Sequence, residues 1–196
     1  MIRRTPRSTR KESSAASDVY KRKSTNRVER LNAAGQLDIR MRQMTGIAKA
    51  KYVAEYVKIL LANGEPVVLS GWHRDVYQIW LDELQEYNPV MYTGSESQTQ
   101  KKEAFEKFLS GESQVFIISL RSGEGLDGLQ KRSSIVVIGE LDWTAAAHNQ
   151  LIGRLNRDGQ TEQVTAIYLV SETGSDPLIQ ALLGLKASQL EGIINP

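Results

Sequence analysis

Residues 66–92 read PVVLSGWHRDVYQIWLDELQEYNPVMY, and this stretch decides the fold class. Its start, residues 66–70, is short, β-branched and apolar on both faces, which is typical of a strand that helices cover on both sides. A helix is predicted over residues 73–87, followed by a second short strand at residues 89–92. Strand, helix and strand in this order predict a βαβ unit whose two strands run parallel.

The same alternation extends along most of the chain. Further strands are expected at residues 115–120, 135–138 and 164–170, and further helices at residues 47–62, 98–109, 145–155 and 176–189. Helix and strand alternating five times predict an α/β fold with a doubly wound, mainly parallel sheet of five or more strands. In such sheets the functional residues lie in the loops that follow the carboxyl ends of the strands.

The amino-terminal part of the chain differs in charge from the rest. Residues 1–30 contain ten Lys or Arg and three Asp or Glu, a net charge of +7, whereas the remainder carries a net charge of −5. We expect a disordered basic arm over residues 1–17, a helical linker over residues 18–46 that ends at Gly46, and a globular domain over residues 47–196. A basic arm on an acidic body suits contact with phosphates, and a solvated tail without a ligand is the alternative.

Composition excludes several classes of protein. No apolar run approaches the roughly 18 residues that span a bilayer, so no membrane contact is expected. The absence of cysteine excludes a disulfide framework, and two histidines argue against a structural zinc site. The Arg- and Ser-rich start lacks the apolar face of a targeting signal, so we expect a soluble, cytoplasmic protein.

Two arginines near the end of the predicted sheet carry the strongest local signal. Arg154 and Arg157 stand three residues apart in QLIGRLNRDGQ, residues 150–160, and so share one face of a helix and its exit. Two guanidinium groups aimed together can each bind phosphate oxygens in a planar, bidentate way. Taken alone, such a pair is more often a solvated helix face.

This segment resembles motif VI of superfamily 2 helicases, Q-x-x-G-R-x-x-R-x-G-Q, and its ending Arg-x-Gly-Gln-Thr is similar to the Swi/Snf branch. Trp143, preceded by Asp142, stands seven residues before Gln150, which is the spacing of that branch.

Four further segments resemble the same family and occur in its order. Residues 67–73 resemble motif IV, residues 119–127 resemble motif V, and residues 92–95 are similar to the Tyr-x-Gly-Ser segment between these motifs. Residues 42–49 look like the linker by which bacterial and phage members enter this lobe. The chain therefore resembles the C-terminal RecA-like lobe of a Swi/Snf-type helicase or translocase.

The resemblance implies roles for individual residues. Arg157 would be the arginine finger, and Arg154 would join it in reaching the γ-phosphate of ATP held by another lobe. Three further residues would face the nucleotide: Gln150, Gly125 and Asp127. Four others would contact the phosphates of nucleic acid, with DNA favoured over RNA: Thr93, Gly94, Ser119 and Arg121.

The chain lacks a phosphate-binding loop. No G-x-x-x-x-G-K-[ST] sequence occurs, so nothing in the chain cradles the β- and γ-phosphates of ATP or positions Mg²⁺. ATP and Mg²⁺ would be held mainly by a separate P-loop-containing lobe, and this chain is expected to bind no metal itself. The favoured function is half of an ATP-driven motor, as a split enzyme rather than a relic. A non-catalytic nucleic-acid-binding or regulatory module is the alternative.

Overall fold

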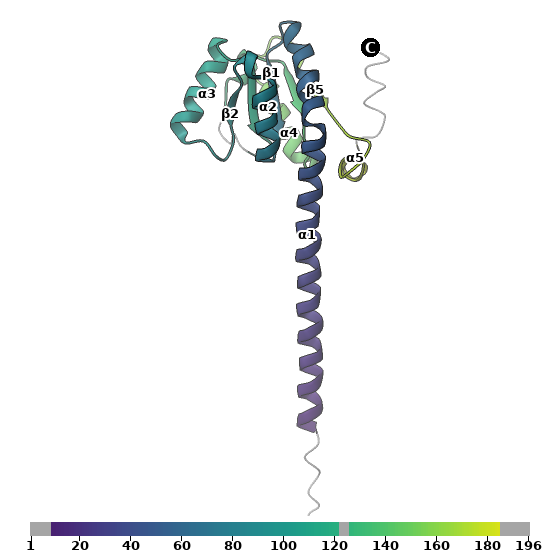
Figure 1. Ribbon diagram of the computed structural model, residues 1–196. Helices are drawn as coiled ribbons and strands as arrows, with labels where there is room; N and C mark the ends of the chain where they lie inside the picture. Colours follow the sequence, from purple (N-terminus) through teal and green to yellow (C-terminus); the bar gives the residue numbers. More distant parts are fainter. Residues whose placement is uncertain (1–8, 122–125, 185–196) are drawn as a thin grey trace, which may run out of the picture. The chain divides into compact units, whose positions relative to one another are not determined.

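The computed structural model describes residues 9–121 and 126–184 (Figure 1). The chain divides into two compact units, Met1–Arg40 and Met41–Pro196. The first unit, as far as it is described, consists of the initial part of a single helix, α1, which runs from Thr9 to Ala62. All other elements belong to the second unit.

The second unit contains a sheet of five strands in the order β2-β3-β1-β4-β5, and every neighbouring pair is parallel. The strands are β1 (Val67–Gly71), β2 (Val90–Tyr92), β3 (Val115–Ser119), β4 (Ile135–Ile138) and β5 (Thr165–Tyr168). The helices are α2 (Arg74–Glu83), α3 (Gln98–Ser110), α4 (Ala145–Leu155) and α5 (Asp176–Leu183). The described part of this unit also contains two short 3-10 helices, Gln85–Tyr87 and Leu129–Lys131. The predicted doubly wound α/β fold is confirmed.

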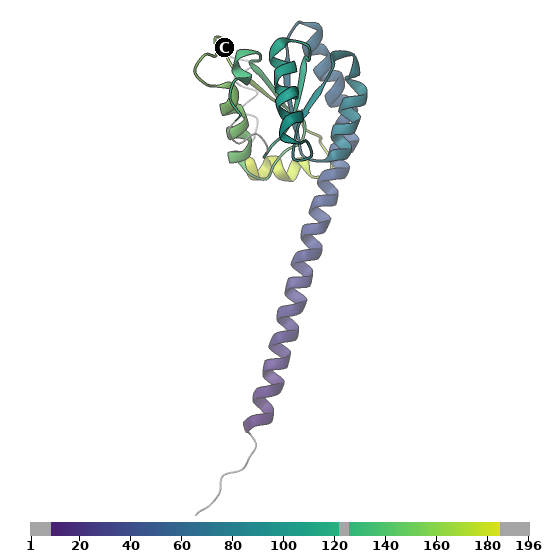
Figure 2. The same cartoon turned by 90° about the vertical axis from the view of Figure 1, so that its left-hand side faces the viewer.

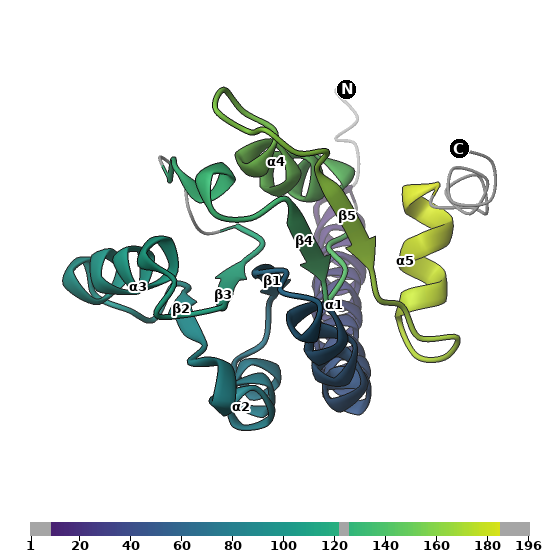
Figure 3. The same ribbon diagram turned by 90° about the horizontal axis from the view of Figure 1, so that it is seen from above.

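Helices cover both faces of the sheet. The carboxyl-terminal part of α1 lies with α2 on one face, and α3 and α4 lie on the other (Figure 3). Figure 2, which is seen from the α3 side, shows this helix in front of the strands that it covers, β2 and β3. Successive strand residues alternate between the two cores: Leu69 packs toward α1 and α2, whereas its neighbour Val68 packs toward α3 and α4.

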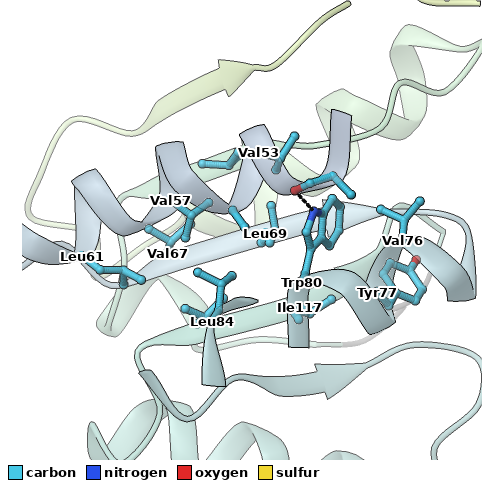
Figure 4. Packing of buried hydrophobic residues seen from close by; sticks show 14 residues of the cluster. Val53, Val57, Leu61, Val67, Leu69, Val76, Tyr77, Trp80, Leu84 and Ile117 are labelled. Atoms are coloured by element: carbon cyan, nitrogen blue, oxygen red, sulfur yellow. Dashed lines mark hydrogen bonds between the residues drawn. The ribbon is translucent and has the colours of Figure 1, made fainter. Parts of the chain in front are cut away.

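Trp80 of α2 lies at the centre of the core between α1, α2 and the sheet (Figure 4). The side chain is fully buried, and its indole N–H donates a hydrogen bond of 3.1 Å to the carbonyl oxygen of Ala50 on α1. This contact satisfies the one polar atom of a large apolar side chain. Trp80 is therefore a residue of the core.

Helix α1 differs from its expected boundaries. It begins at Thr9, before the expected start of the helical linker at residue 18, and residues 1–8 of the expected arm lie outside the described residues. Residues 9–34 contain no Gly or Pro, and Ala, Lys, Arg and Glu have high intrinsic helix propensities. The expected helix end at Gly46 is wrong, because α1 continues through this residue to Ala62.

Gly46 is a close-contact position rather than a helix end. A Cβ at this position would overlap Oε1 of Glu140 and would lie 2.9 Å from Cγ2 of Val76. Glycine inside a helix costs about 1 kcal/mol relative to alanine. Glycine is nevertheless required here, because the backbone of α1 approaches the exit of β4 too closely for a larger residue.

Residues 42–49 attach α1 to the rest of the second unit by polar contacts. Arg42 Nη2 donates to the carbonyl oxygen of Leu141 at 2.8 Å. Lys49 and Asp176 form a buried ion pair of 2.6 Å, and Lys49 Nζ also donates to the carbonyl oxygen of Leu169. The segment that resembles the family's linker is therefore the part of α1 that contacts the exit of β4 and the start of α5.

We predict that Gly46→Ala lowers the free energy of unfolding by about 1–3 kcal/mol, because the added methyl group must displace Glu140 from a packed site. Gly35→Ala is the matched control, since Gly35 lies on the same helix with nothing within 4 Å of its added Cβ. Denaturant unfolding of both variants measures the effect. Equal midpoints for the two variants would contradict the close contact.

Candidate functional site

The carboxylate of Glu140, two residues after the end of β4, connects the ends of two neighbouring strands. It is 4% exposed and accepts hydrogen bonds from the backbone N–H groups of Trp72 (2.7 Å) and His73 (2.9 Å). Its other oxygen lies 2.7 Å from Nδ1 of His73. A buried carboxylate is stable only when its oxygens are hydrogen-bonded in this way. Glu140 therefore fixes the loop between β1 and α2 against the exit of β4.

Asp142 lies two residues further along the same exit. Its buried side chain accepts hydrogen bonds from the backbone N–H (2.9 Å) and hydroxyl (2.8 Å) of Thr144, the residue before α4. It also pairs with Arg121 at 3.2 Å. Burial raises the pKa of Asp142, but the hydrogen bonds from Thr144 and the nearby guanidinium groups of Arg121 and Arg42 outweigh it and hold the pKa below its ordinary value.

His148 on α4 completes this exit. Its Nε2 lies 3.0 Å from the backbone nitrogen of Asp142 and accepts a hydrogen bond from that N–H. Burial lowers the pKa of His148, although the carboxylate of Asp142 opposes the shift. An acceptor nitrogen carries no proton, so the fold requires the neutral imidazole. His148 therefore serves as a structural acceptor at this strand exit.

Loops after β1, β2 and β3 form a pocket of about 330 Å³, which we call the Arg121 pocket. It is lined by Trp72, Arg74, Tyr77, Thr93, Gly94, Ser95, Ser119 and Arg121. All four residues that were predicted to contact nucleic acid line it: Thr93, Gly94, Ser119 and Arg121. Fold topology thus gathers these residues at the carboxyl edge of the sheet, where ligands of doubly wound folds bind.

Arg121 is held in place within this pocket. Its guanidinium carbon lies 5.0 Å from the centre of the Trp72 ring, and Nη2 donates to Asp142 at 3.2 Å. Thr93 is engaged differently from expectation: its backbone N–H and its hydroxyl both donate to the carboxylate of Glu96. Thr93 therefore holds the loop after β2, and the donors available to a ligand come from other residues.

A second pocket, of about 370 Å³, lies between the motif V and motif VI segments and is called the Arg157 pocket. It is lined by Asp127, Gln130, Arg157 and Asp158. Arg157 is partly exposed, and its Nη1 donates to Asp127 at 3.2 Å while its Nε donates to the carbonyl oxygen of Gly153 at 3.1 Å. The hydrogen bond from Gln130, followed by that from Arg157, holds the pKa of Asp127 below its ordinary value.

The other predicted nucleotide-facing residues are placed as follows. Arg154 donates from Nη1 to the carbonyl oxygen of Leu126 at 3.3 Å, so motif VI also contacts motif V through its first arginine. Gln150 lies exposed on α4. Gly125 lies outside the described residues.

Gln130 is a site residue that sequence reasoning missed. Its side-chain oxygen accepts from the N–H of Gly128, and its amide nitrogen donates to Asp127 and to the carbonyl oxygen of Asp158. The buried amide therefore ties the motif V loop to the exit of motif VI. No local pattern distinguishes this glutamine from a surface residue, because its partners include a residue 28 positions away.

No group of three or more His, Asp or Glu side chains within the described ranges could hold a metal ion. Asp127 already accepts from Arg157 and Gln130, and a guanidinium group in the same pocket suits an anion rather than a cation. Similarly, no helix in the described part of the chain is both long and apolar enough to cross a bilayer.

The pattern of the helicase conserved C-terminal domain family matches residues 48–159, which is more than half of the chain. The chain belongs to this family. It is similar to the DNA annealing helicase and endonuclease ZRANB3 of Mus musculus, with 29% identity over 161 residues, and to that of Homo sapiens, with 29% over 162 residues. The chain spans 15% of the length of these relatives, and 80% of it is matched.

A solved structure supports the same fold for this helicase lobe. The C-terminal part of the Fun30 ATPase domain superposes with a TM-score of 0.61 at 21% sequence identity, and the match covers 67% of this chain and 43% of that one. The family match identifies the chain as a helicase C-terminal lobe, and the motifs and the curated relatives agree with the Swi/Snf type of superfamily 2.

We predict that the helicase lobe loses stability as the pH falls below about 6.5, because burial lowers the pKa of His148 in the folded state. The stability that neutral His148 contributes is fully present above the ordinary histidine pKa. It is lost as the pH falls toward the lower pKa that His148 has in the folded state. Each pKa unit of difference corresponds to about 1.4 kcal/mol.

Urea unfolding at pH 7.5 and at pH 5.0 tests this prediction. The variant His148→Gln keeps a side-chain acceptor but cannot titrate, so it should lose less stability between the two pH values than the unmodified chain. An equal loss in both proteins would show that His148 is not the titrating group.

Proposed function

We propose that this helicase lobe is the second half of an ATP-dependent nucleic-acid helicase or translocase, and that Arg157 acts as its arginine finger. The supporting observation is the position of Arg157, 42% exposed on the motif VI exit and facing the Arg157 pocket beside Asp127. ATP and Mg²⁺ would be held mainly by a P-loop-containing lobe, since this chain contains no P-loop sequence.

The contacts of Arg157 leave its guanidinium group able to exchange one anionic partner for another. Its hydrogen bonds to Gly153 and Asp127 use two of the five guanidinium N–H donors. The ion pair with Asp127 is exposed on both sides, and exposed pairs contribute little to stability. Arg157 can therefore exchange Asp127 for a phosphate group without a large loss of free energy.

In phosphoryl transfer, negative charge develops on the oxygens of the γ-phosphoryl group. A guanidinium placed there stabilises the transition state, and an arginine finger is worth roughly 10³–10⁵ in rate. Arg154, held against the motif V carbonyl of Leu126, would support the same charge from one turn earlier on the helix. Gln150, on the exposed face of α4, would face the P-loop lobe, and Asp127 would contact the nucleotide once Arg157 has left it.

The Arg121 pocket would form part of the nucleic-acid track. It combines two guanidinium groups, Arg74 and Arg121, with the hydroxyl groups and exposed backbone of Ser95, Ser119 and Gly94. Such groups bind backbone phosphates without reading bases. The similar mouse and human proteins are DNA annealing helicases by name, which favours DNA as the polymer. A cytoplasmic location and a bacterial or phage-like origin stay predictions.

The alternative function is a nucleic-acid-binding module without a role in ATP hydrolysis, and it predicts that replacing Arg157 leaves ATP turnover unchanged. The proposed function predicts a loss of turnover. We expect the purified chain to show no ATPase activity above background, and a matching P-loop lobe with nucleic acid to restore turnover. Arg157→Ala should then lower turnover by roughly 10³-fold or more, because the finger acts on the transition state. Arg157→Lys should rescue poorly, since an ammonium lacks the planar fork.

Steady-state ATP hydrolysis of the mixed lobes measures these effects, with nucleic-acid binding measured in parallel. Lys102→Ala is the matched control, because Lys102 is an exposed cation on α3, away from both pockets. It should leave turnover unchanged. Turnover that persists in Arg157→Ala would reject the finger assignment and support the non-catalytic module.

The basic residues of the amino-terminal thirty generate a separate prediction about salt. Each phosphate that a protein neutralises on duplex DNA adds roughly −0.9 to the slope of log K against log salt. Residues 1–30 carry a net charge of +7, so their deletion should flatten the slope by up to about 6. Replacing seven of their ten Lys and Arg by Gln, which brings the net charge of the segment to zero, should give the same result at full length. A slope that neither change alters would show that these residues do not touch the polymer.

A further inference from the structure

Arg157 lies in the loop between α4 and β5, and two side-chain amides hold the backbone of this loop on either side of it. The amide nitrogen of Gln160 donates to the carbonyl oxygen of Leu155 at 3.3 Å. The amide nitrogen of Gln130 donates to the carbonyl oxygen of Asp158 at 3.3 Å. The backbone is therefore anchored two residues before Arg157 and one residue after it, while the guanidinium group at the end of the side chain extends beyond both anchors.

Gln130 is the more deeply buried of the two anchors. Its side chain is 5% exposed, and its oxygen accepts a hydrogen bond of 2.9 Å from the backbone N–H of Gly128. Its nitrogen donates to the carbonyl oxygen of Asp158 and to the carboxylate of Asp127. A reversed amide would turn its nitrogen toward an N–H group and its oxygen toward a carboxylate. The hydrogen-bonding groups of a buried amide need partners, so the contacts of Gln130 allow one orientation only.

The segment that carries Gln130 is itself fixed by packing. Gln130 belongs to the 3-10 helix Leu129–Lys131, in which Leu129 is fully buried. Gly128, which precedes this helix, has a φ of +113°, and a Cβ there would lie 3.0 Å from the ring of Phe105 on α3. A side chain can orient a functional group only when its own position is locked. Gln130 meets this condition, although it lies outside both motif segments, residues 119–127 and 150–160.

Gln130 and Arg157 share one oxygen of Asp127. Both donate to Oδ1, each at a distance of 3.2 Å. When Arg157 leaves this oxygen, Gln130 still donates to it, and the carboxylate, whose side chain is 67% exposed, stays in contact with water. The departure of Arg157 therefore leaves no charged group without a partner. The Gln130 amide thus lowers the cost of moving the guanidinium group while it keeps the backbone beneath that group in place.

We propose that Gln130 is a positioning residue for Arg157. It holds the loop backbone at Asp158 so that the guanidinium group reaches the γ-phosphoryl group, and it remains the partner of Asp127 when Arg157 departs. This role rests on the proposed function, because it takes Arg157 to be the arginine finger. A misplacement of about 1 Å in a catalytic group can lower a rate by roughly 10²-fold, so a buried amide that acts through the loop backbone can control turnover.

Gln130→Met tests this role, since methionine fills a similar volume but cannot donate to Asp158 or Asp127. ATP hydrolysis by the full chain, mixed with a matching P-loop lobe and nucleic acid, would be measured across ATP concentrations. We expect kcat to fall by roughly 10- to 100-fold and KM for ATP to change by less than about threefold, because Arg157 acts mainly on the transition state.

Ser113→Ala is the matched control. It also removes a buried hydrogen bond, from Ser113 Oγ to the carbonyl oxygen of Val115, but at a position away from the Arg157 pocket. Its kcat should equal that of the unmodified chain. Gln130→Glu is a second test variant, because it keeps the shape and the acceptor toward Gly128 but loses both donors and adds a carboxylate beside Asp127. Its kcat should fall at least as far as that of Gln130→Met, and a normal kcat in both Gln130 variants would overturn the proposal.

A double-mutant cycle separates positioning from a general structural role. If Gln130 acts through Arg157, adding Gln130→Met to Arg157→Ala should slow single-turnover hydrolysis no further. An equal slowing in the presence and absence of Arg157 would remove Gln130 from the path to the finger and leave the finger assignment intact. If the unmodified chain supports no hydrolysis, or if hydrolysis is insensitive to Arg157→Ala, the proposed function fails and the positioning role fails with it.

Hydrogen–deuterium exchange of the full chain, without ATP or a second lobe, tests the structural step alone. The backbone N–H of Gln160 donates to the carbonyl oxygen of Arg157 at 3.0 Å inside the held loop. We expect residues 156–160 to exchange about 10-fold faster in Gln130→Met, because local opening becomes easier, and at the normal rate in Ser113→Ala. Unchanged exchange in Gln130→Met would show that the amide does not hold the loop and would overturn the proposal, whatever the effect on turnover.

Discussion

The buried carboxylate of Glu140 is the interaction on which the arrangement of this lobe depends. It reaches from the end of β4 to the backbone of the loop after β1, and it fills the space that Gly46 leaves on α1. Two further glycines near Glu140 are also close-contact positions: a Cβ at Gly71 or Gly139 would lie within 3.0 Å of the Trp80 ring. A charged group is stable in this interior only because several donors converge on it. The fold is therefore fixed where its strands end, which is also where its functional loops begin.

The consequence is that one short segment positions both pockets. Asp142, two residues after Glu140, holds Arg121 on the nucleic-acid side and the start of α4 through Thr144 and His148. The same helix carries Arg154 and leads directly to Arg157, and Gln130 ties the motif V loop to that exit. A phosphate bound beside Arg121 and an ATP molecule facing Arg157 would thus be held by groups that share one rigid support. A shared support of this kind would allow the affinity for nucleic acid to depend on the bound nucleotide.

Sequence reasoning predicted the strands, the order of the motif loops and four of the eight residues that line the Arg121 pocket, because short-range patterns and topology determine them. It could not find Gln130 or Glu140, whose importance comes from partners far along the chain. Gly46 illustrates the limit best: locally it is a helix breaker, but its contact with Glu140 makes it a packing residue inside a helix. Thr93 was assigned to phosphate by its motif, yet a carboxylate three residues later takes both of its donors.

The central claim is that Arg157 leaves Asp127 to act on ATP bound by a partner lobe. A structure of this lobe with a matching P-loop lobe, nucleic acid and a transition-state analogue such as ADP with aluminium fluoride measures this most directly. The account predicts the Arg157 guanidinium at hydrogen-bond distance from the fluoride group, about 2.7–3.2 Å, with the contact to Asp127 broken. A guanidinium that remains on Asp127 while another cation occupies that position would contradict it.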